Sequence, residues 1–476
     1  MFLFAALGVG CASGENAPYA AATDCDSATA TEEEGDTDGG IDAGEIDDSF
    51  CGDIETVVAL SEQISTVGIV TWSTSMTAIT DARIEFGRLG AVEYTAPVDL
   101  DAPEHRTLLL GMKPSTVYQY QVVVEGEGRV CKSRPAEVET GPIAVGLPTP
   151  IVSDSQPESA SGEFIVTSLV TNRTVFILDK DGDIVWWYNF GNADYQGTEM
   201  EGFSRVHMSF DGTEMWGGNI NFGRGNGRLY RVGMDGAGEV EPEITYHHHD
   251  FAVLPDNRLA LIEFDEDGQA VGEGTCDRIV ERTPEGEIER IYALREGLAN
   301  LTASTEWCHA NAIHYSPSED AYYVSVLMQS RIVKINRSER RLEWIFDGDD
   351  PHSDFTGGDW VRQHGFHALE EEILIFNNGD DTGGIAASAR ILAYALDEAA
   401  GTAILEWAYD PGITTAMLGD VQRLQNGNTL VTYSTASALH EIDIDGNLVR
   451  ETTFLFGAAL GYADARRSLY GPPDRY

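Results

Sequence analysis

The sequence predicts an all-β protein, in which a six-bladed β-propeller follows a small β-sandwich. A two-part unit recurs six times after about residue 158, at a spacing of about fifty residues. Between 52 and 141, short alternating runs are separated by turn residues at a spacing typical of sandwiches. With 476 residues, 42% of them hydrophobic, the chain can bury more than one core.

The amino-terminal segment is apolar over residues 1–10 (MFLFAALGVG) and is followed by Cys11, like the tail of a bacterial lipoprotein signal. The first basic residue is Arg83, so the basic region of a signal is missing, and Gly8 stands where a lipobox usually carries Leu. Two alternatives remain, a lipid anchor at Cys11 and an ordinary secretion signal. Both predict export, to the periplasm, the cell surface or the medium.

Residues 11–50 consist mainly of Ala, Asp, Glu, Gly, Ser and Thr, which have little to bury, and they predict a disordered acidic linker. The whole chain is acidic, with 79 acidic and 30 basic residues and a formal charge of −49. Such a surface repels phosphate backbones and anionic lipids, so we expect no nucleic-acid partner. An anionic substrate would need a locally basic pocket.

The six cysteines, at 11, 25, 51, 131, 276 and 308, form no CxxC pair. Cys51 and Cys131 bracket the sandwich region, and Cys276 and Cys308 flank one propeller segment. We therefore expect two disulfides, Cys51–Cys131 and Cys276–Cys308, and an oxidising compartment.

The sandwich is expected over 51–142, with strands near 57–60, 67–72, 82–86, 105–110, 117–124 and 136–140. The stretches GIVTWS and LLLGMKPSTVYQYQVV resemble a fibronectin type III module, in which a Trp on an early strand packs under the Leu and Tyr of later strands. The resemblance implies a spacer or docking module.

The propeller is expected over 150–476. Its unit contains a hairpin with a polar turn, found at 175–188, 229–244, 279–292, 332–346, 391–409 and 439–454. A second hairpin-like element, such as LPDNRLALIE or LQNGNTLVTYS, precedes each one, and two hairpins make one four-stranded blade. Asp-rich turns at 179–183, 265–268 and 443–446 lack the twelve-residue EF-hand loop, so we expect plain turns there.

Three histidines lie at the same position in three consecutive blades. Each is about seven residues before the turn that follows the first strand of its blade. They are His249 in HHHDFAVLPDN, His309 in CHANAIHYSPSED and His364 in QHGFHALEEE. Because inner strands converge on the central channel, these side chains are predicted to share one site.

The segments that carry these histidines resemble the blades of bacterial arylsulfate sulfotransferases, over about 155–460. The HxN motif, the QH pair, FxNG and the SxRxxxY strand occur in the family's order. The resemblance implies transfer of a sulfuryl group from an aryl sulfate to a phenol, without PAPS or another cofactor, through a sulfohistidine. It assigns His364 as the nucleophile, with His309, Asn311 and His249 holding the sulfuryl and phenol oxygens.

One position departs from the family, which carries an Arg shortly after the HxN strand where this chain has Leu327. Leu cannot pair with a sulfate. Arg331 lies four residues after Leu327, so on a continuous strand the two side chains would point to the same face. Arg331 and Arg390 in SARILAY are the candidate substrate-binding cations. For Arg331, a plain salt bridge to a carboxylate is the alternative.

No metal site is expected, because along a strand His247 and His249 share one face and His248 the other. His314 and His367 are expected to be strand or turn residues. Three classes of function are compatible with these features: the exported sulfotransferase, a non-catalytic propeller that binds ligands with Leu327 as a sign of decay, and a metal-dependent hydrolase or lyase. The sequence does not predict the oligomeric state.

Overall fold

The computed structural model describes residues 53–473 except 90, 127, 192–201, 222–226, 243, 266–273, 303–304, 349–351, 380, 383–384 and 456–458. The chain divides into two compact units, 1–47 and 48–476, and the described residues all belong to the second. The described part is all-β, and its helical segments are three-residue 3-10 turns. It contains no helix with the length and hydropathy needed to span a bilayer.

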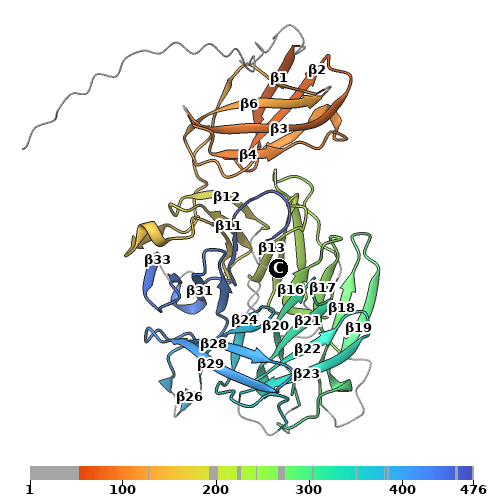
Figure 1. Ribbon diagram of the computed structural model, residues 1–476, viewed down its shortest axis with the longest axis vertical. Helices are drawn as coiled ribbons and strands as arrows, with labels where there is room; N and C mark the ends of the chain where they lie inside the picture. Colours follow the sequence, from red (N-terminus) through yellow and green to blue (C-terminus); the bar gives the residue numbers. More distant parts are fainter. Residues whose placement is uncertain are drawn as a thin grey trace, which may run out of the picture. The chain divides into compact units, whose positions relative to one another are not determined.

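Residues 54–139 form two antiparallel sheets around one apolar core (Figure 1). One sheet contains β1 (Ile54–Leu60), β2 (Gly68–Thr74) and β5 (Thr107–Leu109). The other contains β3 (Ile79–Arg88), β4 (Tyr94–Pro97), β6 (Val117–Gly126), β7 (Arg129–Lys132) and β8 (Ala136–Glu139). Both sheets contribute to the core, where Trp72 and Leu109 of one join Tyr118 and Tyr120 of the other. The short strands β4 and β7 were not predicted, because four residues give too few alternations to detect.

Six further antiparallel sheets follow one another along the chain (Figure 1). The first three contain β10 (Phe164–Ser168), β11 (Thr174–Leu178) and β12 (Ile184–Asn189); β13 (Phe203–Met208), β14 (Glu214–Asn219) and β15 (Leu229–Gly233); and β16 (His247–Val253), β17 (Leu259–Phe264), β18 (Asp277–Arg282) and β19 (Ile288–Ala293). The next two contain β20 (Ala310–Ser316), β21 (Ala321–Val326), β22 (Arg331–Asn336) and β23 (Arg341–Asp347); and β24 (Gln363–Ala368), β25 (Glu372–Asn377), β28 (Arg390–Asp397) and β29 (Thr402–Tyr409). The last contains β30 (Asp420–Arg423), β31 (Thr429–Tyr433), β32 (Ala438–Ile442) and β33 (Leu448–Phe454), and a two-stranded ribbon, β26 (Asp381–Thr382) and β27 (Ile385–Ala386), lies apart from these.

The first and the last of these sheets are completed by strands from the opposite end of the chain. β34 (Asp464–Arg466) pairs with β10, and β9 (Pro150–Asp154) pairs with β33. The sequence predicted a hairpin-like element at 159–168, but the structure has only β10 there, since its partner comes from the carboxyl-terminal segment. These pairings cover edges that would otherwise be open to other strands.

The first strands of successive sheets contact one another in chain order, from β10 through β13, β16, β20 and β24 to β30. The buried guanidinium of Arg205 on β13 bonds Asp250 on β16 at 2.8 Å and Asp420 on β30 at 2.7 Å. Asp250 also accepts the backbone N–H of Ile313 on β20 at 3.0 Å. Charged side chains thus tie four inner strands together in a β-propeller-like all-β fold.

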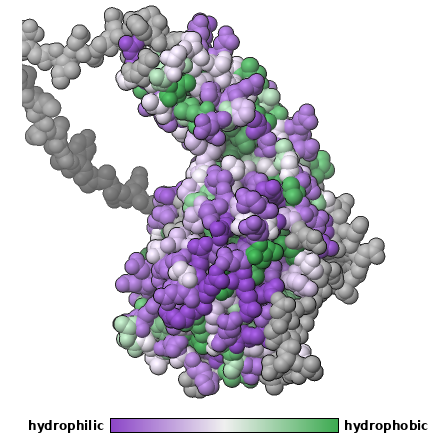
Figure 2. Space-filling view, turned by 90° about the vertical axis from the view of Figure 1, so that its right-hand side faces the viewer, coloured by the Kyte–Doolittle hydropathy of each residue, from purple (hydrophilic) through white to green (hydrophobic). Residues whose placement is uncertain are grey.

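The predicted disulfide between Cys276 and Cys308 is present, with Cα atoms 4.8 Å apart. Cys131 is also disulfide-bonded, and its predicted partner Cys51 lies outside the described residues. The Asp-rich turn at 179–183 receives an ammonium group, because Lys113 Nζ lies 2.6–3.1 Å from the carboxylates of Asp179, Asp181 and Asp183. Hydrophilic residues cover much of the face in Figure 2, as the charge of −49 requires.

Candidate active site

The starts of the inner strands β16, β20 and β24 have an irregular backbone. The β16–β17, β20–β21 and β24–β25 pairs each shift register at this point. His249, His309 and Arg362 adopt φ angles of 61°, 53° and 58°, in the left-handed region that non-glycine residues rarely occupy. Bulges and left-handed residues turn side chains away from the regular alternation of a strand, and they are common beside functional sites.

His364 is buried, with 6% of its surface exposed, and its ring has one specified orientation. Its Nδ1 lies 2.8 Å from Asn378 Oδ1, while the Asn378 amide nitrogen donates to the carbonyls of Thr415 and Leu418, both at 2.9 Å. Since the amide nitrogen is engaged by two carbonyls, the amide oxygen must face His364 and accept from Nδ1–H. The lone pair of His364 is therefore on Nε2. Burial lowers the pKa of His364 to about 4, so the ring is neutral near pH 7.

His249 and His309 lie beside each other, with ring centroids 4.7 Å apart. The pKa of His249 is held well below its ordinary value, first by burial and then by the nearby rings of His309, His248 and His364. His309 Nδ1 lies 2.9 Å from Glu306 Oε1, and its side chain is 20% exposed. The structure thus brings the three predicted histidines into one cluster that is accessible at His309.

Asn311 is buried next to the predicted nucleophile. Its amide nitrogen donates to the carbonyl of Gln363 at 2.9 Å, and its oxygen accepts from Ser325 Oγ at 2.7 Å. The Gln363 side chain donates to Ser325 Oγ at 3.0 Å and to the carbonyl of Arg331 at 2.8 Å. These bonds fix the backbone immediately before His364, which is a positioning contribution in addition to the predicted oxygen-binding one.

The cation predicted at Arg331 has a different environment from the one expected. Leu327 begins a 3-10 turn (Leu327–Gln329), and Arg331 begins the next strand, β22. The two residues do not share one strand, so the prediction that they lie on the same face of a strand was wrong. Arg331 is buried, and its Nε lies 2.6 Å from Asp347 Oδ2. The Leu327 N–H donates to the carbonyl of His309 at 3.1 Å, so the position without the family Arg does adjoin the histidine cluster.

Arg390 begins β28, where it pairs in register with Asn377, the neighbour of Asn378. It lines a surface pocket of about 360 Å³ together with Trp360, Val361 and Asn377. Among the described residues, Arg390 makes no hydrogen bond or ring contact with His249, His309 or His364.

Sequence reasoning missed two residues, Asn378 and Arg362. Asn378 lies within the recognised FxNG motif, which could have identified it. Arg362 is exposed, precedes the QH pair, and its positive charge contributes to the lowered pKa of His364. Among the described residues it makes no ion pair with a carboxylate.

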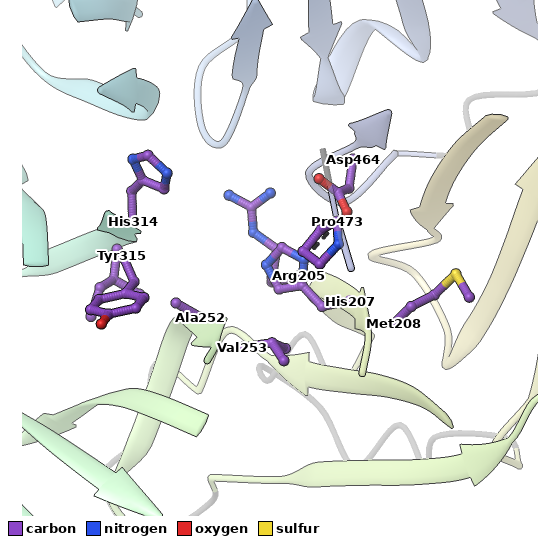
Figure 3. Close-up of a pocket in the computed structure, with 10 residues that line it drawn as sticks. Arg205, His207, Met208, Ala252, Val253, His314, Tyr315, Asp464 and Pro473 are labelled. Atoms are coloured by element: carbon purple, nitrogen blue, oxygen red, sulfur yellow. Dashed lines mark ion pairs between the residues drawn. The ribbon is translucent and has the colours of Figure 1, made fainter. Parts of the chain in front are cut away.

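A separate cavity lies at the other end of the inner strands, lined by Arg205, His207, His314 and Asp464 among others (Figure 3). His207 Nδ1 lies 3.7 Å from Asp464 Oδ2. With a volume of about 30 Å³, the cavity can hold water but not an aromatic ester. His314 lies on β20 and His367 on β24, as strand residues.

The histidine cluster is suited to nucleophilic group transfer. A neutral imidazole with an oriented lone pair is a good nucleophile, and a second neutral imidazole beside it can exchange protons. In the described part of the chain, no group of three or more His, Cys, Asp or Glu residues could hold a metal ion.

Comparisons with solved structures give weak similarity. A streptogramin B lyase is 14% identical, with 67% of this chain and 98% of that chain covered and a TM-score of 0.40. A virginiamycin B lyase from Staphylococcus aureus is 12% identical, with 65% of this chain and 90% of that chain covered and a TM-score of 0.39. A periplasmic gluconolactonase from Pseudomonas aeruginosa is also 12% identical, with 63% of this chain and 99% of that chain covered and a TM-score of 0.38. Nothing about the reaction follows from similarity at this level, and no curated protein sequence matches the chain.

The family model described as arylsulfotransferase (ASST) matches residues 151–454. This match covers more than half of the chain and includes every residue of the histidine cluster, so the protein belongs to the arylsulfotransferase family.

Proposed function

We propose that this protein transfers a sulfuryl group from an aryl sulfate to a phenol through a covalent intermediate on His364. The observation that carries the proposal is the state of His364, a buried neutral imidazole whose Nδ1–H is held by Asn378 and whose Nε2 carries the lone pair. Membership of the arylsulfotransferase family supports the same reaction class.

In the first half-reaction, His364 Nε2 forms a bond to sulfur while the bond from sulfur to the phenolic oxygen breaks. In the second half-reaction, the oxygen of the acceptor phenol attacks sulfur and the N–S bond breaks, which returns its electron pair to Nε2. Covalent transfer divides one difficult displacement into two easier ones. The rings of His309 and His249 and the amide of Asn311 are proposed to hold the sulfuryl and phenol oxygens, where charge is dispersed in the transition state.

The donor is an anion in a chain of net charge −49, so the site needs a cation. We assign this role to Arg362, whose charge acts on His364, with Arg390 at the neighbouring surface pocket. Arg331 is less suited because Asp347 already neutralises it.

We also infer the architecture and location of the enzyme. The six sheets after residue 150 are interpreted as the six blades of one propeller closed by β9 and β34, and the two sheets before it as a fibronectin type III-like sandwich. We propose that the protein is exported, with a lipid anchor at Cys11 or as a secreted protein, and that a disordered acidic linker at 11–50 precedes the folded part.

The first prediction concerns the covalent intermediate. Exposure to 4-nitrophenyl sulfate without a phenol should add one sulfuryl group, located on His364 by peptide mass spectrometry. His364→Ala should abolish both the adduct and turnover, because no other route passes through the intermediate. His309→Ala should lower the rate by about 10²–10³-fold, the scale of one lost charge-stabilising donor.

A matched control is His440→Ala, which removes another buried histidine with a lowered pKa, on β32, without touching the cluster. Its activity should stay near that of the wild type. Full activity in His364→Ala would exclude the covalent route.

The second candidate function, a non-catalytic binding protein, is favoured by one observation, the apolar Leu327 beside His309. If the wild type is inactive while Leu327→Arg turns over aryl sulfates, the site has decayed through loss of its cation. If neither the wild type nor Leu327→Arg is active, the binding-protein function is the better one.

A further inference from the structure

The backbone around His249 lacks the hydrogen bonds of a regular strand. The register of β16 against β17 shifts between His247 and Phe251, so the three residues 248–250 oppose only Ile262. This bulge is buried. Buried backbone N–H and C=O groups need hydrogen-bond partners, and those of a bulge have to come from outside the ladder.

The preceding sheet supplies these partners, since its strand β13 contacts β16 (Figure 1). The hydroxyl of Ser204 on β13 donates to the carbonyl of His249 at 2.5 Å. The N–H of His249 donates to the carbonyl of Ile220, directly after β14, at 3.0 Å. The amide nitrogen of Asn221 donates to the carbonyl of His247 at 2.6 Å. Both backbone polar groups of His249 are thus bonded to the preceding sheet.

These bonds hold a conformation that His249 would not favour by itself. Its φ of 61° lies in the left-handed region, which is disfavoured for residues with a side chain and persists only where surrounding contacts maintain it. A change in φ would move the ring relative to its neighbours. The backbone bonds therefore determine that the His249 ring lies 4.7 Å from the ring of His309, centre to centre.

We infer that Ser204 and Asn221 are positioning residues of the reaction, which hold the bulge of β16 and thereby place the His249 ring in the histidine cluster. The inference rests on the proposed function, in which His249 holds an oxygen of the sulfuryl group or the phenol. Both side chains are buried, and they act on substrate only through His249. Placement of this kind matters because a displacement of about 1 Å can lower a rate by about 10²-fold.

The alternative is that Ser204 only stabilises the fold. Its hydroxyl lies 3.3 Å from the carbonyl of Gly218, a longer contact than the one to His249, and its own carbonyl accepts the N–H of Tyr462 at 2.8 Å. The two roles differ in one measurable respect. A positioning residue affects the rate through the His249 ring, so its effect disappears when that ring is absent, whereas a general loss of stability does not depend on the ring.

The test is a double-mutant cycle of Ser204→Ala and His249→Gly. Glycine tolerates the left-handed φ, so His249→Gly removes the ring without adding backbone strain. With 4-nitrophenyl sulfate and phenol, Ser204→Ala should lower kcat by about 10–10²-fold while KM changes by less than about 3-fold, because the oxygens are held mainly in the transition state. In the His249→Gly background, Ser204→Ala should change kcat by less than about 2-fold.

Asn221→Gly is the second variant, since the φ of 51° at this position also suits glycine and only the amide is lost. It should lower kcat in the same way. Ser168→Ala is the matched control, because Ser168 is another completely buried serine whose hydroxyl donates to a backbone carbonyl, that of Phe203 at 2.9 Å. Its kcat should stay near that of the wild type. Urea titrations verify that each variant is folded.

Spectra of protein with carbon-13-labelled histidine rings test the placement independently of activity. The His249 signal is assigned by its absence in His249→Gly. It should shift in Ser204→Ala and in Asn221→Gly, while the signal of His440 stays in place.

An unmoved His249 signal in both variants would overturn the inference, as would an equal loss of kcat from Ser204→Ala with and without the His249 ring. A wild type that forms no adduct with 4-nitrophenyl sulfate would reject the proposed function instead. In that case the shift of the His249 signal still decides whether Ser204 and Asn221 place the ring.

Discussion

Among single residues, Asn378 has the clearest consequence for chemistry. Two carbonyls hold its amide nitrogen, so its oxygen can only accept from His364. A carboxylate in this position would raise the pKa of His364, whereas the neutral amide orients the ring and leaves burial to lower it. The nucleophile is thereby kept unprotonated over most of the pH range.

The activity should therefore have an acidic limb set by His364. Because only the neutral ring attacks sulfur, kcat/KM of the wild type should fall as pH drops through about 4. Asn378→Asp adds a negative charge beside the ring, so the limb should move to higher pH by roughly one unit or more, as for an opposite charge in contact.

The measurement is kcat/KM for 4-nitrophenyl sulfate against pH, with circular dichroism at each pH to verify the fold. A folded Asn378→Asp variant with an unmoved limb would show that His364 does not control this limb.

At the level of elements, the inner strands are held by a charged cluster. Arg205 lies between Asp250 and Asp420, and its guanidinium lies 4.2 Å from the ring centre of Tyr462. The Tyr462 hydroxyl donates to the carbonyl of Asn311 at 3.1 Å. The cluster thus joins strands far apart in sequence and supports the backbone next to the histidines.

Removing the positive charge of Arg205 should destabilise the folded protein. Arg205→Met leaves two buried carboxylates without a cation, and we expect a loss of about 3–5 kcal/mol in the free energy of unfolding, as for other broken buried pairs. Urea denaturation followed by tryptophan fluorescence measures this loss.

The compensating variant combines Arg205→Met with Asp250→Asn and Asp420→Asn. It also removes the negative charges of the two carboxylates and should recover much of the stability. Arg341→Met removes an exposed ion pair and should change stability by less than about 1 kcal/mol. A loss of that small size in Arg205→Met would show that the cluster does not hold the inner strands.

For the whole molecule, the buried histidines make stability depend on pH. Burial lowers the pKa of His247 to about 3 and of His364 to about 4, and it lowers that of His249 as well. In the unfolded chain these rings have an ordinary pKa of about 6.5. Between these limits the unfolded state binds more protons, so stability is complete above about pH 6.5 and is lost as pH falls toward the folded values.

His247→Gln should weaken this dependence. The variant removes one titrating ring, so the slope of unfolding free energy between about pH 6 and pH 4 should fall by up to about 1.4 kcal/mol per pH unit. Its amide can still donate to the carbonyl of Ile262, which His247 Nδ1 contacts at 3.2 Å. Urea titrations at several pH values measure the slope, and the exposed His352→Gln provides the control. Equal slopes in all three proteins would contradict burial of a neutral His247.

Local pattern in the sequence predicted much of what is observed. The hairpins expected at 279–292 and 332–346 are β18–β19 and β22–β23, because alternation and turn residues act between neighbours in the chain. The equal distance of His249, His309 and His364 from the turns that follow them predicted that these three histidines share one site. The Cys276–Cys308 bridge was also predicted.

Only tertiary structure decided what depends on residues far apart in sequence. The pairing of β34 with β10 joins segments about three hundred residues apart, and no local signal specifies that partner. Leu327 begins a 3-10 turn and Arg331 begins the strand after it, so counting positions along a single strand could not relate them. The tautomer of His364 depends on Asn378, because the position of the proton on the ring is set by the acceptor that the fold brings to Nδ1.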